Sequence, residues 1–209
     1  MTSSQTDDLS FVRQMAEAGR NAPLLGGRFF VFYGVLIPIA YAVQWMVLSG
    51  EFGLPYAVIG WNWLAFGAAV AVGMPLLLRT IRRKPGRGTA GNRAEAAAWM
   101  FAGFTIGAFF LGVLIANLIG ATSQIAFDYI LAVAFTGYGI ALFVTASLAG
   151  TSWLKVPAYI SMASVGIVPV LAGRPDVYLF GATVVLLVSL YPGIRLMMAE
   201  PKSLPAEDA

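Results

Sequence analysis

The fold is decided by residues 56–120, which read YAVIGWNWLAFGAAVAVGMPLLL (56–78), RTIRRKPGRGTAGNRAE (79–95) and AAAWMFAGFTIGAFFLGVLIANLIG (96–120). Two long apolar runs without a charged residue enclose a short segment rich in arginine. A hydrocarbon layer about 30 Å thick needs roughly 20 apolar residues at a helical rise of about 1.5 Å per residue. Each run is therefore long enough to cross a membrane as a helix.

The same alternation of apolar run and short polar gap extends over most of the chain. Hydrophobic residues make up 59% of it and charged residues only 11%, which is far from the balance of a soluble domain. We therefore predict an all-α fold, a polytopic transmembrane helical bundle of six spans. The expected spans are residues 29–49, 56–78, 96–120, 129–150, 156–173 and 177–198.

Acidic and amide residues in the gaps suggest where helices begin. Asp128 and Asp176 stand immediately before the fourth and sixth apolar runs, where a carboxylate can cap free backbone N–H groups. Asn92 and Glu95 have the spacing of a capping pair for the third run. These four side chains are expected to bond to their own helices.

The chain divides into three parts. Residues 1–28 form a cytoplasmic N-terminal segment, either an amphipathic helix lying in the membrane interface or a solvated tail. Residues 29–198 form the transmembrane domain. Residues 199–209 form a cytoplasmic tail for which we expect disorder.

Lysine and arginine predict the orientation, because positively charged loops stay on the cytoplasmic side. With the N-terminus inside, every basic residue except Arg174 lies on the inner face. We therefore expect both termini in the cytoplasm and a multi-pass protein of the plasma membrane or a bacterial inner membrane. The high isoelectric point, about 9.3, then reflects topology and not a nucleic-acid surface.

The basic gap has two interpretations. It can serve only to hold the loop inside, which the positive-inside rule explains without any ligand. It can also contact anionic lipid head groups or a partner, at about 1 kcal/mol per basic residue near the surface. The residues concerned are Arg79, Arg82, Arg83, Lys84, Arg87 and Arg93.

The chain contains neither cysteine nor histidine. Disulfides, thiolate catalysis, Ser-His-Asp triads and metal sites built on imidazole or thiolate are thereby excluded. Glu51, Asp128 and Asp176 stand alone in separate gaps, which disfavours an all-carboxylate metal site. We expect no cofactor and no metal, and the inventory argues against an enzyme.

Uncharged polar side chains are the informative residues within the spans. Threading the spans places Gln44, Asn62 and Asn117 in the outer third of the membrane. An amide in lipid needs a partner, so the three can hydrogen-bond across helix interfaces, which is the structural interpretation. The functional interpretation is an outward-facing polar vestibule with Gln124 and Asp128 at its rim.

Small residues mark places where helices can approach closely. Gly103 and Gly107 form a G-x-x-x-G pair, and Ala65, Ala69 and Gly73 form a ridge on the second span. Such ridges favour close packing of helices in membranes. Packing within one subunit is the first expectation, and a homo-oligomer interface is the alternative.

Two classes of function follow. The first is a facilitator or channel component for a small neutral or amphipathic solute, motivated by the outer-third amides and glycine-rich spans. The second is a membrane-embedded regulatory or accessory subunit that binds a cytoplasmic or membrane partner. The second class needs no cavity at all.

One short segment resembles a known family. Asn21-Ala22-Pro23-Leu24, the six spans and the chain length are loosely similar to the succinate-acetate permease family, whose N-terminal signature reads Asn-Pro-Ala-Pro-Leu-Gly. The similarity covers only a few residues and departs at the first proline of the signature. No site residue is carried over from it.

Overall fold

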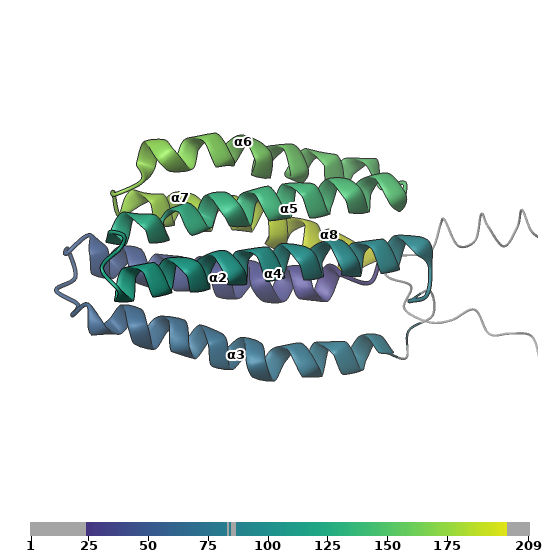
Figure 1. Ribbon diagram of the computed structural model, residues 1–209. Helices are drawn as coiled ribbons and strands as arrows, with labels where there is room; N and C mark the ends of the chain where they lie inside the picture. Colours follow the sequence, from purple (N-terminus) through teal and green to yellow (C-terminus); the bar gives the residue numbers. More distant parts are fainter. Residues whose placement is uncertain (1–23, 83, 85–86, 200–209) are drawn as a thin grey trace, which may run out of the picture.

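The computed structural model describes residues 24–82, 84 and 87–199, and every regular element among them is a helix (Figure 1). The long helices are α2 (Gly27–Leu48), α3 (Ala57–Arg82), α4 (Ala90–Leu118), α5 (Tyr129–Leu148) and α6 (Lys155–Leu171). The last span consists of α7 (Asp176–Val185), the π-helical turn η3 (Leu186–Leu190) and α8 (Tyr191–Ala199). Two 3-10 turns, η1 (Gln124–Phe127) and η2 (Ser152–Leu154), precede α5 and α6.

Six helical segments among these residues are long and apolar enough to cross a membrane, which confirms the predicted number of helices. Two of them extend into the basic gap beyond the apolar runs. α3 continues to Arg82, and α4 begins at Ala90 instead of the predicted Ala96. Arginine and alanine are good helix formers, and Thr89 caps α4, so the backbone remains helical past the apolar run.

The ends of the chain are only partly covered by the described residues. The proposed interfacial helix falls mostly within residues 1–23, which lie outside the described part, as do residues 200–209. Within the predicted N-terminal segment, Leu24 and Leu25 are buried at 5% exposure each. The chain therefore already packs against the bundle just before α2 begins.

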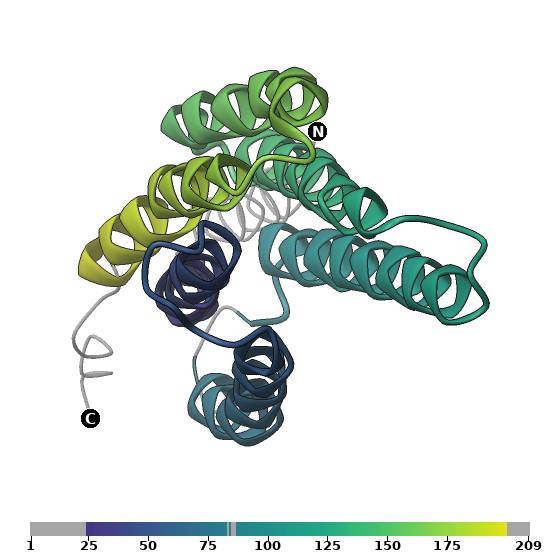
Figure 2. The ribbon, with the colours of Figure 1, turned by 90° about the vertical axis from the view of Figure 1, so that its left-hand side faces the viewer.

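The helices lie side by side in two rows (Figure 2). In one row α2 stands between α3 and the last span, and it contacts α3, α7, η3 and α8. In the other row α5 stands between α4 and α6. Contacts between α6 and α7 join the rows at one side, whereas α3 packs mainly on α2.

The core lies between the rows. Phe135 and Leu142 of α5 belong to one buried cluster with Val185 of α7 and Val188 of η3, and each of these side chains is at most 1% exposed. In a membrane, lipid tails would be as apolar as these side chains, so close van der Waals packing, not escape from water, would hold the helices together. The shape of the contacts therefore decides the stability of the bundle.

The backbones of α2 and the last span approach each other closely. A Cβ atom at Gly34 would lie 2.5 Å from the backbone nitrogen of Leu190, and one at Gly193 would lie 2.7 Å from the α2 backbone. Ser189 donates a hydrogen bond from Oγ to the carbonyl of Phe30 at 2.8 Å. Since Ser189 and Leu190 belong to η3, the π-helical turn forms part of the surface against which α2 packs.

Candidate functional site

The two aspartates predicted as helix caps make other contacts, because their side chains turn toward neighbouring elements. Asp128 occupies the capping position of α5 but makes no capping bond. It is 6% exposed, and its carboxylate accepts hydrogen bonds from Gly173 N at 2.7 Å and from the Tyr178 hydroxyl at 2.6 Å. These three residues, the outer polar cluster, join α5 to the α6–α7 turn and α7. Asp176 is the first residue of α7 and pairs with Arg174 at 3.0 Å.

The side chains of the predicted capping pair do not cap the third span. The N-cap of α4 is Thr89, whose side chain accepts from Asn92 N at 3.5 Å. The side-chain oxygen of Asn92 accepts from Leu25 N at 2.9 Å, just before α2 begins. The buried Glu95 carboxylate lies beside Gly26, and its Oε1 has no hydrogen-bond partner among the described residues. Asn92 and Glu95 therefore pack against the chain that leads into α2.

Two of the predicted vestibule residues join α2 to α3. The indole Nε1 of Trp63 donates to the side-chain oxygen of Gln44 at 2.6 Å. Asn62 donates from Nδ2 to the carbonyl of Ala40 at 2.9 Å. Gln44 is 8% exposed, so it faces protein and not an open channel. These bonds supply each amide with a partner across the helix pair.

The other vestibule residues lie apart from that helix pair. Asn117 is partly buried near the end of α4, and Gln124 is exposed in η1. Neither side chain makes a hydrogen bond within residues 24–82, 84 and 87–199. Asp128 belongs to the outer polar cluster. The five residues therefore do not form one connected network of hydrogen bonds.

The basic segment lies at the end of the bundle where α3 ends and α4 begins, opposite the outer polar cluster (Figure 1). Lys155 begins α6, and Arg195 lies within α8. Both residues belong to this same end of the bundle, which we call the basic end. Lys84 is partly buried. The side chain of Arg82 and the whole of Arg83 lie outside the described residues. The exposed members of the segment are Arg79, Arg87 and Arg93.

The predicted G-x-x-x-G pair packs against none of the described residues. A Cβ atom at Gly103 or Gly107 of α4 would meet nothing within 4 Å, and the same holds for Gly60 and Gly67 of α3. In the most apolar stretch of α3 only 6% of residues are buried, and in α4 only 11%, compared with 56% in the last span. Of the ridge on α3, Gly73 packs against the ring of Phe32. The faces around these four open glycines are called here the α3–α4 glycine faces.

Within the described part of the chain, no three acidic side chains gather closely enough to hold a metal ion. Comparison with protein-family models, with curated proteins and with solved structures finds no match for this chain. The short similarity at Asn21–Leu24 therefore assigns no family. Function has to be argued from the arrangement of the chain's own residues.

Sequence reasoning missed the glycines that pack between α2 and the last span. Gly34 and Gly193 allow contact between α2 and the last span, and neither belongs to a G-x-x-x-G pair. Gly27 and Gly34 are seven residues apart, which is about two helical turns and places both on one face. This seven-residue spacing is the sequence signal from which the contact between α2 and the last span could have been predicted. It is hard to separate from chance in a chain with 23 glycines.

Proposed function

We propose that the chain is a membrane-embedded accessory subunit whose α3 and α4 hold the helices of a partner membrane protein. The observation that carries the proposal is the open space at the α3–α4 glycine faces. Small residues let helix backbones approach closely in lipid and are typical of helix interfaces there. Because these glycines have no neighbouring helix among the described residues, a helix from another chain would fill the space.

The surroundings of the glycine faces support this proposal. Large apolar side chains flank them and are widely exposed, among them Trp61 and Leu64 of α3 and Phe101 and Phe104 of α4, at 65–73% exposure. Side chains of this kind can insert beside the small residues of a second helix. By contrast, the outer polar cluster joins α5 to α7, and glycine packing joins α2 to the last span. The chain thus has a well-packed half and a half with open helix faces.

Lipid alone could cover the same faces, and substitution by leucine separates the two cases. A Cβ atom at Gly67 or Gly103 meets no atom of the described residues within 4 Å, so a leucine there would face lipid if no partner covers it. At a partner interface the same side chain would force the helices apart. We therefore expect Gly67→Leu and Gly103→Leu to release the partner without lowering the stability of the chain itself.

The experiment compares protein mass with stability. The complex is extracted from membranes in mild detergent, and its protein mass is measured by size exclusion with light scattering. We expect a mass above the 22.2 kDa of one chain, and a return to 22.2 kDa in both leucine variants. A multiple of 22.2 kDa would identify the partner as a second copy. A wild-type mass of 22.2 kDa would contradict the proposal.

The intended control is Gly34→Leu, which introduces the same side chain where α2 packs on η3. That variant should lower the unfolding midpoint of the chain, whereas Gly67→Leu and Gly103→Leu should not. If all three variants unfold early, the glycine faces pack within the chain. The unfolding midpoint thus distinguishes a glycine that packs within the chain from the glycines of the α3–α4 glycine faces.

We further infer that both termini lie on the cytoplasmic side of a plasma membrane or bacterial inner membrane. The support is the concentration of basic residues at one end of the bundle, with Arg174 at the other. The exposed Arg79, Arg87 and Arg93 would then face the cytoplasm, where they can contact anionic head groups or a partner. A reporter fused to the C-terminus that is active only in the cytoplasm tests the orientation.

A second candidate is the solute facilitator, favoured by Asn117. Its side chain is partly buried in the membrane-length part of α4 and has no hydrogen bond to any described residue. A polar solute passing between α4 and its neighbours could bond to it. Replacing Asn117 with leucine should abolish solute flux in proteoliposomes if this candidate holds, and unchanged flux would remove it.

A further inference from the structure

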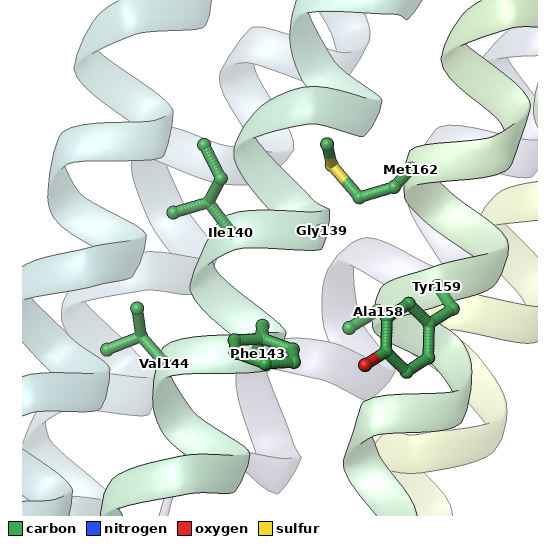
Figure 3. A pocket seen from close by; sticks show the side chains of 7 residues that line it. All are labelled: Gly139, Ile140, Phe143, Val144, Ala158, Tyr159 and Met162. Carbon is green, nitrogen blue, oxygen red and sulfur yellow. The ribbon is translucent and has the colours of Figure 1, made fainter.

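An apolar hollow of about 200 Å³ opens on the side of the bundle between α5 and α6, facing away from the core (Figure 3). Its lining contains no polar surface. It lies in the halves of α5 and α6 nearer to the basic end, because α5 runs toward that end and α6 starts there. The residues that line it are Gly139, Ile140, Phe143 and Val144 of α5 and Ala158, Tyr159 and Met162 of α6.

The hollow exists because small residues face each other across the helix pair. Gly139 has no side chain, and a Cβ there would lie 2.6 Å from Met162 Cγ and 3.3 Å from the Ala158 carbonyl. Ala158 adds only a methyl group. The rings of Phe143 and Tyr159, with centroids 5.9 Å apart, close the end nearer to the basic end (Figure 3). Backbones approach closely, and no side chain fills the space outside them.

The open side of the hollow faces away from the bundle. Ile140, Phe143 and Tyr159 at its border are 54%, 41% and 62% exposed. In a membrane this surface would be in contact with acyl chains. A hollow too narrow for a helix but lined with apolar groups is suited to a single hydrocarbon chain.

A lysine stands at the end of the hollow nearest the basic end. The Nζ atom of Lys155 lies 5.6 Å from the ring centroid of Phe143. Lys155 is also the first residue of α6, one turn before Tyr159. Close in sequence, Trp153 has the Arg195 guanidinium over its ring at 4.7 Å. Cationic and aromatic groups therefore meet at the level where lipid head groups would lie.

We propose that this hollow binds one acyl chain of an anionic phospholipid whose phosphate is held by Lys155. From Lys155 to Met162 the helix rises about 10 Å, which separates the head-group contact from the deepest part of the hollow. The apolar lining supplies the site for the chain, and the ammonium group supplies the charge complementary to phosphate. The site is distinct from the α3–α4 glycine faces and does not depend on a partner protein.

Native mass spectrometry of the full chain tests this site. The purified protein is mixed with equal amounts of dioleoyl phosphatidylglycerol and dioleoyl phosphatidylcholine, and bound lipids are counted. We expect the anionic lipid to be retained preferentially. Lys155→Gln should lower its retention about fivefold, which is the factor equivalent to about 1 kcal/mol for one basic residue. Lys155→Arg, which keeps the charge, should retain it.

Filling the hollow gives an independent variant. Ile140→Trp places a large ring at the border of the hollow and should reduce binding of both lipids. Val170→Trp, at an exposed position of α6 outside the hollow, and Arg174→Gln, at the opposite end of the bundle, are the matched controls. Circular dichroism confirms that each variant remains helical.

Several outcomes would overturn the proposal. They are equal retention of the two lipids by the wild-type chain, unchanged retention in Lys155→Gln, and loss of the anionic lipid in the two controls as strong as in Ile140→Trp. Oleate supplied as a third probe distinguishes the source of the charge. If oleate binds as well as phosphatidylglycerol and depends equally on Lys155, the site takes free carboxylates and the phospholipid assignment is wrong.

Discussion

Alanine at position 34 tests the packing of the bundle most sharply, because it adds one methyl group where two backbones touch. The added Cβ would lie 2.5 Å from Leu190 N, whereas ordinary contacts of this kind are 3.4–4 Å. The two atoms nearest to the added Cβ belong to the backbone of Leu190, so they cannot turn away as a flexible side chain can. α2 and η3 therefore have to separate by about 1 Å, which matches the difference between these distances.

The separation has a predictable effect on the free energy of unfolding. Overpacking of this kind costs about 1–3 kcal/mol. Moving α2 away also stretches the 2.8 Å bond between Ser189 and the Phe30 carbonyl, and an interhelical bond in lipid contributes about 0.6 kcal/mol. Alanine stabilises a helix relative to glycine by about 1 kcal/mol. The net expectation is a loss of about 0.5–2.5 kcal/mol in Gly34→Ala.

Gly103→Ala is the matched control, since its Cβ would meet nothing within 4 Å. There only the helix propensity remains, and we expect a gain of up to about 1 kcal/mol. Unfolding is followed by circular dichroism as sodium dodecyl sulfate is added to mixed micelles. The two variants should shift the midpoint in opposite directions. If Gly34→Ala is as stable as Gly103→Ala, the close contact between α2 and η3 is refuted.

Three further variants probe the polar contacts. Asp128→Ala leaves the two donors of the outer polar cluster without an acceptor, so it should lower the unfolding free energy by about 2 kcal/mol or more and speed hydrogen exchange of the Gly173 amide; unchanged exchange there would argue against the cluster. Asn92→Ala leaves the Leu25 N–H without its acceptor and should cost about 1–3 kcal/mol in the same assay, whereas an unchanged midpoint would argue against this contact. Trp63→Phe leaves the buried Gln44 oxygen without its donor, so hydrogen exchange in α3 should rise while exchange in α6 stays constant.

The helices were predictable from the sequence because a membrane imposes a length on apolar runs, and that length is visible in one dimension. Runs such as 56–78 and 129–150 correspond to α3 and α5 with small shifts at their ends. The shifts have a local cause. Alanine and arginine continue a helix beyond the hydrocarbon-length run, so apolarity alone places the ends wrongly.

The contacts of the polar residues could not be predicted in the same way. Asn92 has the local spacing of a cap for its own helix, yet its partner Leu25 is 67 residues away. Asp128 likewise bonds to Gly173 and Tyr178, 45 and 50 residues further along. Local spacing states which bond is available, but only the arrangement of helices decides which bond forms. A carboxylate at a helix end can bond to a neighbouring element instead of its own helix.

Glycine packing shows the same limit. Gly103 and Gly107 match a motif for helix contact but lie in open space, whereas Gly34 matches none and touches backbone. The motif records that a close approach is sterically allowed. It does not record which helix approaches, or whether that helix belongs to the same chain. This is why the unfilled faces of α3 and α4 are informative only once the other helices have been placed.

The central claim is that the α3–α4 glycine faces hold helices of a partner, and cysteine crosslinking in native membranes tests it most directly. The chain contains no cysteine, so Gly67→Cys and Gly103→Cys each introduce a single reactive site. Val170→Cys, at a position 74% exposed on α6, is the control for random collision. We predict one discrete crosslinked product from positions 67 and 103 and none from position 170. Equal or absent crosslinking at all three positions would contradict the account.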